Sequence, residues 1–239
     1  INFAAESHVD KSIKYPKKII LNNILSTTNL LISAQRYFDS LKENKKKKFK
    51  FLQISTDEVY GSLSLADNAF LETDKYFPSS PYSASKASSD HLVSSFNKTY
   101  GLPSLLTNCS NNYGPFQNTE KLIPTVIINA LKKKKIPVYG NGLQIRDWLH
   151  VLDHVKGLEL ISKKGVPNST YLLGGNNQIT NLNIVQDICS LMDTKLRKSM
   201  PSGLSSFSEL ITFVDDRPGH DETYGVDIST IQKNLGWKP

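Results

Sequence analysis

Two spacings of apolar residues alternate along the chain. Short apolar runs of about five positions, such as 49–54, have the length of buried strands, whereas longer segments such as 16–41 repeat apolar residues at the helical period. This order is typical of a mainly parallel sheet with helices on both faces. The expected strands are the end of a strand at 1–4, then 49–54, 104–108, 170–173 and 210–214; the expected helices are 16–41, 81–100, 122–131, 151–162 and 229–235.

The helix expected at 81–100 has clear start signals, because Ser80 is a suitable cap and Pro81 suits the first helical position. Beyond about Asn112 the pattern is less regular, and Gly, Pro and Asn become more frequent. We therefore expect a doubly wound α/β fold. Residues 1–112 form its main sheet domain, and residues 113–239 form a smaller region with some segments that return to the sheet.

The composition narrows the class of protein. The chain has 239 residues, of which 38% are hydrophobic, as in globular proteins. No apolar run approaches the roughly 18 residues of a membrane span, so no membrane partner is expected. Cys109 and Cys189 are far apart and suggest no disulfide framework, which fits a cytoplasmic location. The chain begins at Ile1 within an expected strand, and we interpret it as a fragment.

The formal net charge is +7, and lysine runs at 45–48 and 132–135 contribute to it. Neither run is accompanied by an aromatic stacking motif, so no nucleic-acid partner is expected. Both runs are interpreted as solvated segments at helix ends or in loops. A positive field would help to attract an anionic small substrate.

Candidate chemistry is concentrated in two segments, STDEVYG at 55–61 and YSASK at 82–86. The first follows an expected strand, where ligands bind in open α/β sheets. The second opens a helix and places Tyr82 and Lys86 four residues apart, on one helix face. An ammonium group near a phenol lowers the pKa of the phenol, so Lys86 would allow Tyr82 to act as a base.

Asp57 and Glu58 are adjacent carboxylates at the end of the strand. Within a strand they would point to opposite faces, but beyond its end the chain turns and both can reach one cavity. Two carboxyl groups in different environments can divide into a proton donor and a proton acceptor. A solvated acidic turn is the simpler interpretation of an isolated Asp-Glu pair, and the flanking residues argue against it here.

Together these segments are similar to the extended short-chain dehydrogenase/reductase superfamily, and within it the chain resembles the dTDP-glucose 4,6-dehydratases. The resemblance implies an NAD-binding Rossmann-type fold, NAD as cofactor, dTDP-glucose as substrate, a homodimer and no metal. It also implies a place in the synthesis of rhamnose and other deoxysugars. The matching segments span nearly the whole chain and are 4–10, 55–61, 79–91, 107–115, 120–124, 138–142, 144–148 and 216–220.

The resemblance assigns chemical roles by position. Tyr82 would take the proton of the sugar 4-hydroxyl while carbon 4 gives hydride to NAD, and Lys86 would lower the Tyr82 pKa and hold the nicotinamide ribose. Thr56 would bind the 4-oxygen. Glu58 would remove the proton at carbon 5, and Asp57 would protonate the departing 6-hydroxyl. The hydride would then return to carbon 6.

The same resemblance implies two sets of binding residues. Arg146 attracts attention among them because an arginine fork suits a diphosphate. For NAD the resemblance implies Phe3, Ala4, Ala5, Glu6, Ser7, Tyr82 and Lys86, with Asn22 and Asn112 as weaker candidates. For the nucleotide sugar it implies Ser7, Thr56, Asn111, Lys121, Leu122, Pro137, Val138, Tyr139, Arg146, Asn181, Asp216, Arg217, Pro218, Gly219 and His220.

One departure from the family pattern is the missing glycine-rich fingerprint G-x-G-x-x-G, which should lie upstream of Ile1. Whether this stretch alone binds NAD or folds is therefore left open. Alternatives also stay open: a UDP-glucose 4,6-dehydratase, another nucleotide-sugar epimerase or decarboxylase of the superfamily, and, more distantly, a non-catalytic nucleotide-sugar-binding homologue. The residues Thr56, Asp57 and Glu58 favour the retaining glucose dehydratases.

The helices at 16–41 and 81–100 are expected to form the homodimer interface. The second has apolar residues, Ala84, Leu92, Val93 and Phe96, beyond what one sheet contact would need. Burial of this surface between two copies would stabilise the dimer. The alternative is that both apolar faces simply cover the sheet.

Overall fold

A parallel sheet forms the centre of the computed structural model, which describes residues 1–64, 66–197, 200 and 203–239. The strand order is β1-β2-β6, with Phe51 opposite Ser104 and Leu106 opposite Thr170. At one edge Asn2 pairs in parallel with Gln53 of β1 and so extends the sheet. The strands are β1 (Phe51–Thr56), β2 (Ser104–Cys109) and β6 (Thr170–Leu173).

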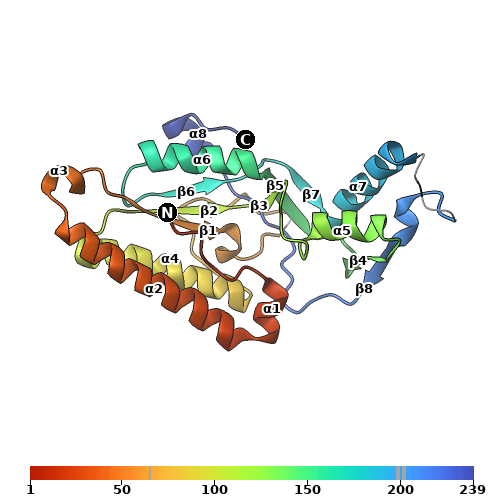
Figure 1. The fold of residues 1–239 in the computed structure, drawn as a ribbon, viewed down its shortest axis with the longest axis horizontal. Coiled ribbons are helices and arrows are strands. Elements are labelled where there is room, and N and C mark those ends of the chain that lie inside the picture. Colours follow the sequence, from red (N-terminus) through yellow and green to blue (C-terminus); the bar gives the residue numbers. More distant parts are fainter. Residues whose placement is uncertain (65, 198–199, 201–202) are drawn as a thin grey trace.

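Helices cover both faces of this sheet. Helices α2 (Pro16–Ser40) and α4 (Pro81–Tyr100) lie side by side on one face, and α6 (Val151–Lys164) and α8 (Ser229–Leu235) lie on the other (Figure 1). Helix α4 begins with a capping box between Ser80 and Ser83, and it ends at Gly101, whose φ of 70° is left-handed. These end signals fix where α4 begins and ends.

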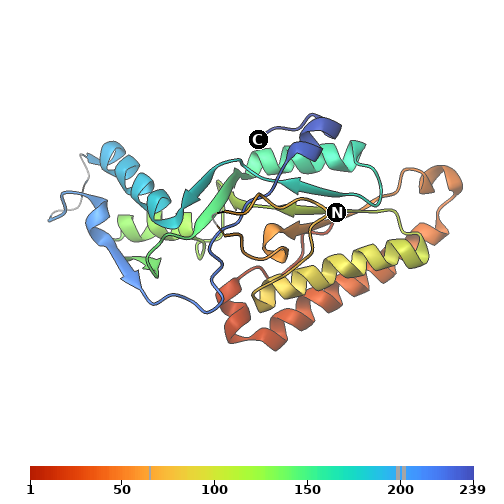
Figure 2. The same ribbon diagram turned by 180° about the vertical axis from the view of Figure 1, so that it is seen from behind.

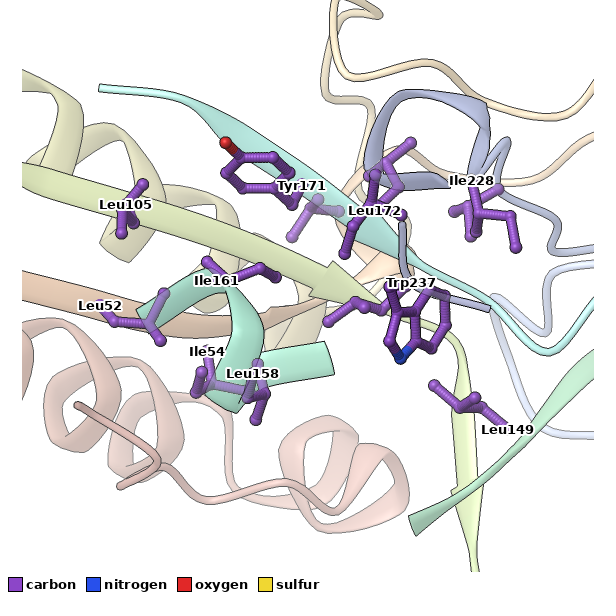
Figure 3. Close-up of a cluster of buried hydrophobic side chains, with 14 of the residues drawn as sticks. Leu52, Ile54, Leu105, Leu149, Leu158, Ile161, Tyr171, Leu172, Ile228 and Trp237 are labelled. Atoms are coloured by element: carbon purple, nitrogen blue, oxygen red, sulfur yellow. The ribbon is translucent and has the colours of Figure 1, made fainter. Parts of the chain in front are cut away.

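The largest apolar cluster joins the sheet to α6 and α8 (Figure 3). Leu52, Leu105 and Leu172 come from the three strands of the sheet and are almost completely buried. Trp237 closes the cluster, and its indole N–H donates to the carbonyl of Asp153 at 3.0 Å. This core holds β1 and β2 in register, so that both strands end at the same place.

A second lobe extends from the sheet and has an apolar core of its own. It contains α5 (Leu122–Leu131), α7 (Asn181–Lys195) and the parallel pair β4 (Ile136–Tyr139) and β8 (Ile211–Val214). The small sheet β3 (Asn111–Tyr113), β5 (Ile145–His150) and β7 (Gln178–Thr180) lies between the two parts. Figure 2 shows the segment after β8 running back from this lobe toward α8. The short helices are α1 (Val9–Lys14), α3 (Glu43–Lys46), η1 (Asp57–Val59) and η3 (Phe207–Leu210).

The structure confirms the predicted α/β class and each of the five predicted helices. The strand predicted at 49–54 is shifted, because β1 begins two residues later than expected and includes Ser55 and Thr56. Of the strand end predicted at 1–4, the structure has a single bridge at Asn2. Helix α7 was missed, although Thr180 caps it and Val185, Cys189 and Met192 repeat at helical spacing. The division at residue 112 into two domains stays a prediction, since α6, β6 and α8 of the second half pack on the first sheet.

The structure also bears on the lysine runs, the two cysteines and the expected lack of a membrane span. The lysines at 132–135 are exposed at the end of α5, and those at 45–48 lie in or just after α3 with little burial. Cys109 and Cys189 are both free thiols, and the cytoplasmic location stays a prediction. Within the described residues, no helix is both long and apolar enough to cross a membrane.

Candidate active site

The carboxyl ends of β1 and β2 open into a cavity of about 290 Å³, here called the strand-end cavity. Thr56 ends β1 opposite Cys109 at the end of β2, and the turn of η1 follows at once. Tyr82 reaches the same cavity from the first turn of α4. The cavity is lined by Ser7, Ser55, Thr56, Asp57, Glu58, Tyr82, Cys109, Ser110, Asn111, Asn112, Gln117, Lys121, Leu122 and Trp148.

Asp57 is the most enclosed carboxyl group of this cavity. Its side chain is buried, its Oδ1 accepts a hydrogen bond from the Thr56 hydroxyl at 3.2 Å, and its Oδ2 has no partner among the described residues. Burial raises the pKa of Asp57 well above its ordinary value, and the nearby charges of Glu58 and Asp147 raise it further. Asp57 is therefore suited to hold a proton and to donate it.

Glu58 lies where the strand-end cavity meets a second cavity of about 240 Å³ between the two lobes, here called the inter-lobe cavity. Desolvation raises the pKa of Glu58, but the positive charges of Arg217, Arg146 and Lys121 act against that rise. Its neighbour Asp57 has no comparable set of cations. The two carboxyl groups thus have the different environments that the sequence predicted, with Glu58 suited to accept a proton.

The predicted effect of Lys86 on Tyr82 stays a prediction. Tyr82 is buried, and burial raises the pKa of its phenol well above the usual value, with the charge of Glu58 the next largest influence in the same direction. The Lys86 ammonium donates to the carbonyl of Ile54 at 2.7 Å, and the largest influences on the Tyr82 pKa do not include it. The two side chains have the predicted helical spacing, and Lys86 is hydrogen-bonded to the sheet.

The inter-lobe cavity gathers most of the predicted nucleotide-sugar residues. Arg217 donates to Asp10 Oδ1 at 3.4 Å, and its Nε is buried without a partner in the described chain. Arg146 stacks on the Tyr224 ring at 4.3 Å and donates to backbone carbonyls. The predicted residues that line this cavity are Glu58, Asn111, Lys121, Leu122, Pro137, Val138, Tyr139, Arg146, Asn181, Arg217 and His220.

Several predicted residues line neither cavity. Asp216 supports the inter-lobe cavity indirectly, because its Oδ1 is 2.6 Å from His220 Nδ1 and its Oδ2 accepts from Gln144 at 3.0 Å. Asn22 is exposed on α2, whereas its neighbour Asn23 is buried and contacts the backbone of Glu6. The others outside the lining are Phe3, Ala4, Ala5, Glu6, Lys86, Pro218 and Gly219.

Trp148 is the main lining residue that the sequence analysis did not single out. It lines both cavities, together with Glu58, Asn111, Lys121 and Leu122. Its position on β5, directly after Arg146 and Asp147, was a usable signal, since alternate residues of a strand face the same side. Tyr224 was also missed, because only the fold brings it under the Arg146 guanidinium.

The strand-end cavity fits the nicotinamide end of NAD. Ser110 Oγ is buried and has no partner in the described chain, which provides a polar group at the cavity wall. The cavity also lies at the carboxyl edge of parallel strands, where dinucleotides bind. Residues 1–64, 66–197, 200 and 203–239 contain no group of three or more His, Cys, Asp or Glu side chains arranged to hold a metal ion.

The buried acid predicts a pH-dependent gain in stability for Asp57→Asn. A raised pKa in the folded state means that stability from proton binding is present at low pH and is lost as pH rises above the unfolded value near 4. Asp57→Asn cannot lose stability in this way. The free energy of unfolding of the variant, relative to that of the wild type, should therefore increase by up to about 1.4 kcal/mol for each unit of rising pH. Urea unfolding at pH 5 and pH 8 measures this. Asp187→Asn, at an exposed site on α7, is the control; an equal difference at both pH values would contradict the assignment.

Comparison with known proteins agrees with this geometry. The model of the GDP-mannose 4,6 dehydratase family matches residues 1–239. The chain belongs to this family. Over its whole length it is 52% identical to the dTDP-glucose 4,6-dehydratase of Neisseria meningitidis serogroup B, of which it covers 67%. The resemblance inferred from the motifs is therefore confirmed.

Solved structures of the family agree with the fold. A dTDP-glucose 4,6-dehydratase of Streptomyces venezuelae, with NAD and TYD bound, has a TM-score of 0.86 and 35% identity over 99% of this chain. The enzyme of Bacillus anthracis in complex with NAD has a TM-score of 0.80 and 39% identity over the whole chain. The chain covers 66% of each of these proteins and so spans about two thirds of the family length.

Proposed function

We propose that this chain carries the reaction site of an NAD-dependent dTDP-glucose 4,6-dehydratase, which converts dTDP-glucose to the 4-keto-6-deoxy sugar nucleotide and water. The observation that carries this proposal is the contrast between two adjacent carboxyl groups: burial raises the pKa of Asp57 well above its usual value, whereas three nearby cations oppose the rise in the pKa of Glu58. An epimerase needs neither group, whereas elimination of water needs a donor and an acceptor on adjacent carbons.

The chain's own residues have distinct tasks in the proposed reaction. Tyr82 accepts the proton of the 4-hydroxyl as its phenolate, a form that the positive charge of Lys86 would favour. The Thr56 hydroxyl next to it holds the 4-oxygen. The ketone acidifies the proton at carbon 5, which passes to Glu58. Asp57 gives its proton to the 6-hydroxyl, which leaves as water. Bound NAD would supply the hydride chemistry, as acceptor for carbon 4 and as donor for carbon 6.

The proposed substrate lies across both cavities, with the sugar in the strand-end cavity and the nucleotide in the inter-lobe cavity. Arg217 is well placed for the diphosphate, since it has a buried donor without a partner in the described chain. Lys121 lines both cavities and donates to the Ser7 carbonyl at 2.9 Å. Pro137, Val138 and Tyr139 would border the nucleoside.

A product assay tests the proposal. The full-length protein with dTDP-glucose should form a sugar nucleotide that has lost one water, detected by mass spectrometry, without net change in NAD. A parallel reaction with UDP-glucose tests the nucleotide base, which Thr56, Asp57 and Glu58 do not determine. Formation of a 4-epimer with unchanged mass would refute the dehydratase assignment.

We also propose a homodimer, with a different face from the one expected. On α4, Val93 is fully buried and Leu92 and Phe96 pack against the same core cluster. Helix α2 instead exposes Leu21, Leu25 and Ile32, with exposed fractions of 45%, 53% and 38%. Their spacing places all three on one stripe of the helix.

The dimer proposal predicts that Leu25→Glu weakens association, because a charge would be buried between two apolar stripes. Light scattering of the full-length protein should give a dimer for the wild type and a lower mass for the variant. Leu191→Glu, at a similarly exposed site on α7, is the matched control and should remain a dimer. A wild-type monomer at micromolar concentration would refute the proposal.

A further inference from the structure

A line of three buried polar side chains runs along α4 from the active site into the protein. Tyr82, Lys86 and Asp90 are four residues apart, and their exposed fractions are 8%, 4% and 1%. This spacing places them on one helix face, which packs on β1 and β2. Tyr82 and Lys86 belong to the proposed reaction, whereas Asp90 has no role in it. A buried carboxylate is costly and calls for an explanation.

Asp90 is connected to the strand ends by hydrogen bonds. Its Oδ2 accepts from the Asn108 amide at 3.3 Å and from the Tyr76 hydroxyl at 3.4 Å. The same Asn108 amide donates to the carbonyl of Thr56 at 3.1 Å. The Asn108 side chain thus links Asp90 to Thr56, the residue directly before the turn that carries Asp57 and Glu58.

The second oxygen of Asp90 is not fully satisfied. Oδ1 has no hydrogen-bond partner of ordinary geometry in the described chain, although the Ser55 hydroxyl is near enough to lower the Asp90 pKa. Burial raises the pKa of Asp90 to about 6, and the Lys86 charge is the largest influence against that rise. The attraction of the Lys86 charge is therefore the main effect that offsets the burial of the ionised Asp90.

The charged form of Lys86 depends in the same way on the charge of Asp90. Burial lowers the pKa of its ammonium, and the charge of Asp90 is the largest influence that raises it. The one hydrogen bond that the described structure gives Lys86 Nζ is to the uncharged carbonyl of Ile54. Cys109 is the other titratable group that acts on Lys86, and burial raises the pKa of its thiol to about 12, so it carries no charge near neutral pH.

Asp90 also lines a third cavity, of about 390 Å³, which shares no residue with the strand-end or inter-lobe cavity. The titratable groups that face Asp90 there are Glu72, Asp74, Lys75, Tyr76 and His91, with Tyr60 from the turn after β1.

We propose that Asp90 is a positioning residue for the reaction, whose negative charge on the same helix face keeps Lys86 in its ammonium form beneath the strand ends. This inference rests on the proposed function, because it concerns the lysine of the same site. Asp90 touches neither substrate nor cofactor and acts through Lys86. Protonation of Asp90 removes the negative charge that favours the ammonium form of Lys86.

A titration of Lys86 in the full-length protein tests the inference without catalysis. Lysine labelled with carbon-13 at the ε position reports each amine by nuclear magnetic resonance, and Lys86→Met assigns the signal. Asp90→Asn should lower the Lys86 pKa by about one unit or more, and Asp90→Glu should restore most of it. Asp74→Asn, an exposed carboxylate on the same cavity, is the matched control and should leave Lys86 unchanged.

If Asp90→Asn does not fold, the reciprocal measurement on Lys86→Met still tests the inference. In Lys86→Met the Asp90 carboxyl should titrate at a clearly higher pH than in the wild type, because the Lys86 charge that lowers its pKa is gone. The hydride-transfer rate of Asp90→Asn should also fall on the alkaline side at a lower pH than that of the wild type. An unmoved Lys86 titration in folded Asp90→Asn, or an unmoved Asp90 titration in Lys86→Met, would overturn the inference. Failure of the wild type to form product would instead refute the proposed function alone.

Discussion

Glu58→Gln is expected to stop the loss of water while the first oxidation continues. The amide of the variant cannot accept the proton at carbon 5, but Tyr82 and Thr56 still serve the 4-hydroxyl. Removal of a general base costs about 10²–10⁴-fold in rate. With dTDP-glucose and bound NAD, the near-ultraviolet absorbance of reduced nicotinamide should rise and remain, and no dehydrated product should form at a comparable rate.

Asp57→Asn separates the acid from the base. An amide cannot protonate the departing hydroxyl, so product formation should fall by a similar factor of about 10²–10⁴. Exchange of the carbon-5 proton with solvent deuterium should persist in Asp57→Asn and disappear in Glu58→Gln. If either variant forms product at nearly the wild-type rate, the corresponding carboxyl group has been assigned the wrong role.

Tyr82→Phe is expected to abolish the first step itself. Tyr82 lines the strand-end cavity, and its phenolate is the proposed acceptor of the 4-hydroxyl proton next to Thr56, whereas phenylalanine has no acceptor there. Single-turnover hydride transfer should fall by about 10²–10⁴-fold. Reduced nicotinamide should then not appear, in contrast to Glu58→Gln.

Tyr60→Phe is the matched control for this loss. Tyr60 is also buried close to the end of β1, but its hydroxyl has no hydrogen-bond partner among the described residues and lines neither active-site cavity. Its removal should leave hydride transfer nearly unchanged. Equal losses in the two variants would point to damage of the core rather than to loss of a base.

The sequence predicts those parts of the molecule whose signals are local. Helix α4 follows from Ser80, Pro81 and Gly101, and the meeting of Asp57 with Glu58 in one cavity follows from the end of an apolar strand. The predicted helix at 122–131 and strand at 170–173 have the observed bounds. In each case neighbouring residues decide the outcome.

Features that depend on distant packing were not predictable in this way. The Lys86 ammonium donates to the Ile54 carbonyl, and the charge of Asp90 raises its pKa; the spacing of Tyr82 and Lys86 reveals neither. The stacking of Arg146 on Tyr224 joins residues 78 positions apart. Helix α7 was missed because the Gly- and Asn-rich segment before it suggested an irregular region.

The path of one hydrogen atom tests the central claim most directly. The full-length protein should be given dTDP-glucose that carries deuterium at carbon 4, and the product should be examined by nuclear magnetic resonance. The account predicts deuterium on the new methyl group at carbon 6, because the atom removed at the first step returns within the same turnover. Deuterium that stays at carbon 4, or that is lost to solvent while a 6-deoxy product forms, would contradict it.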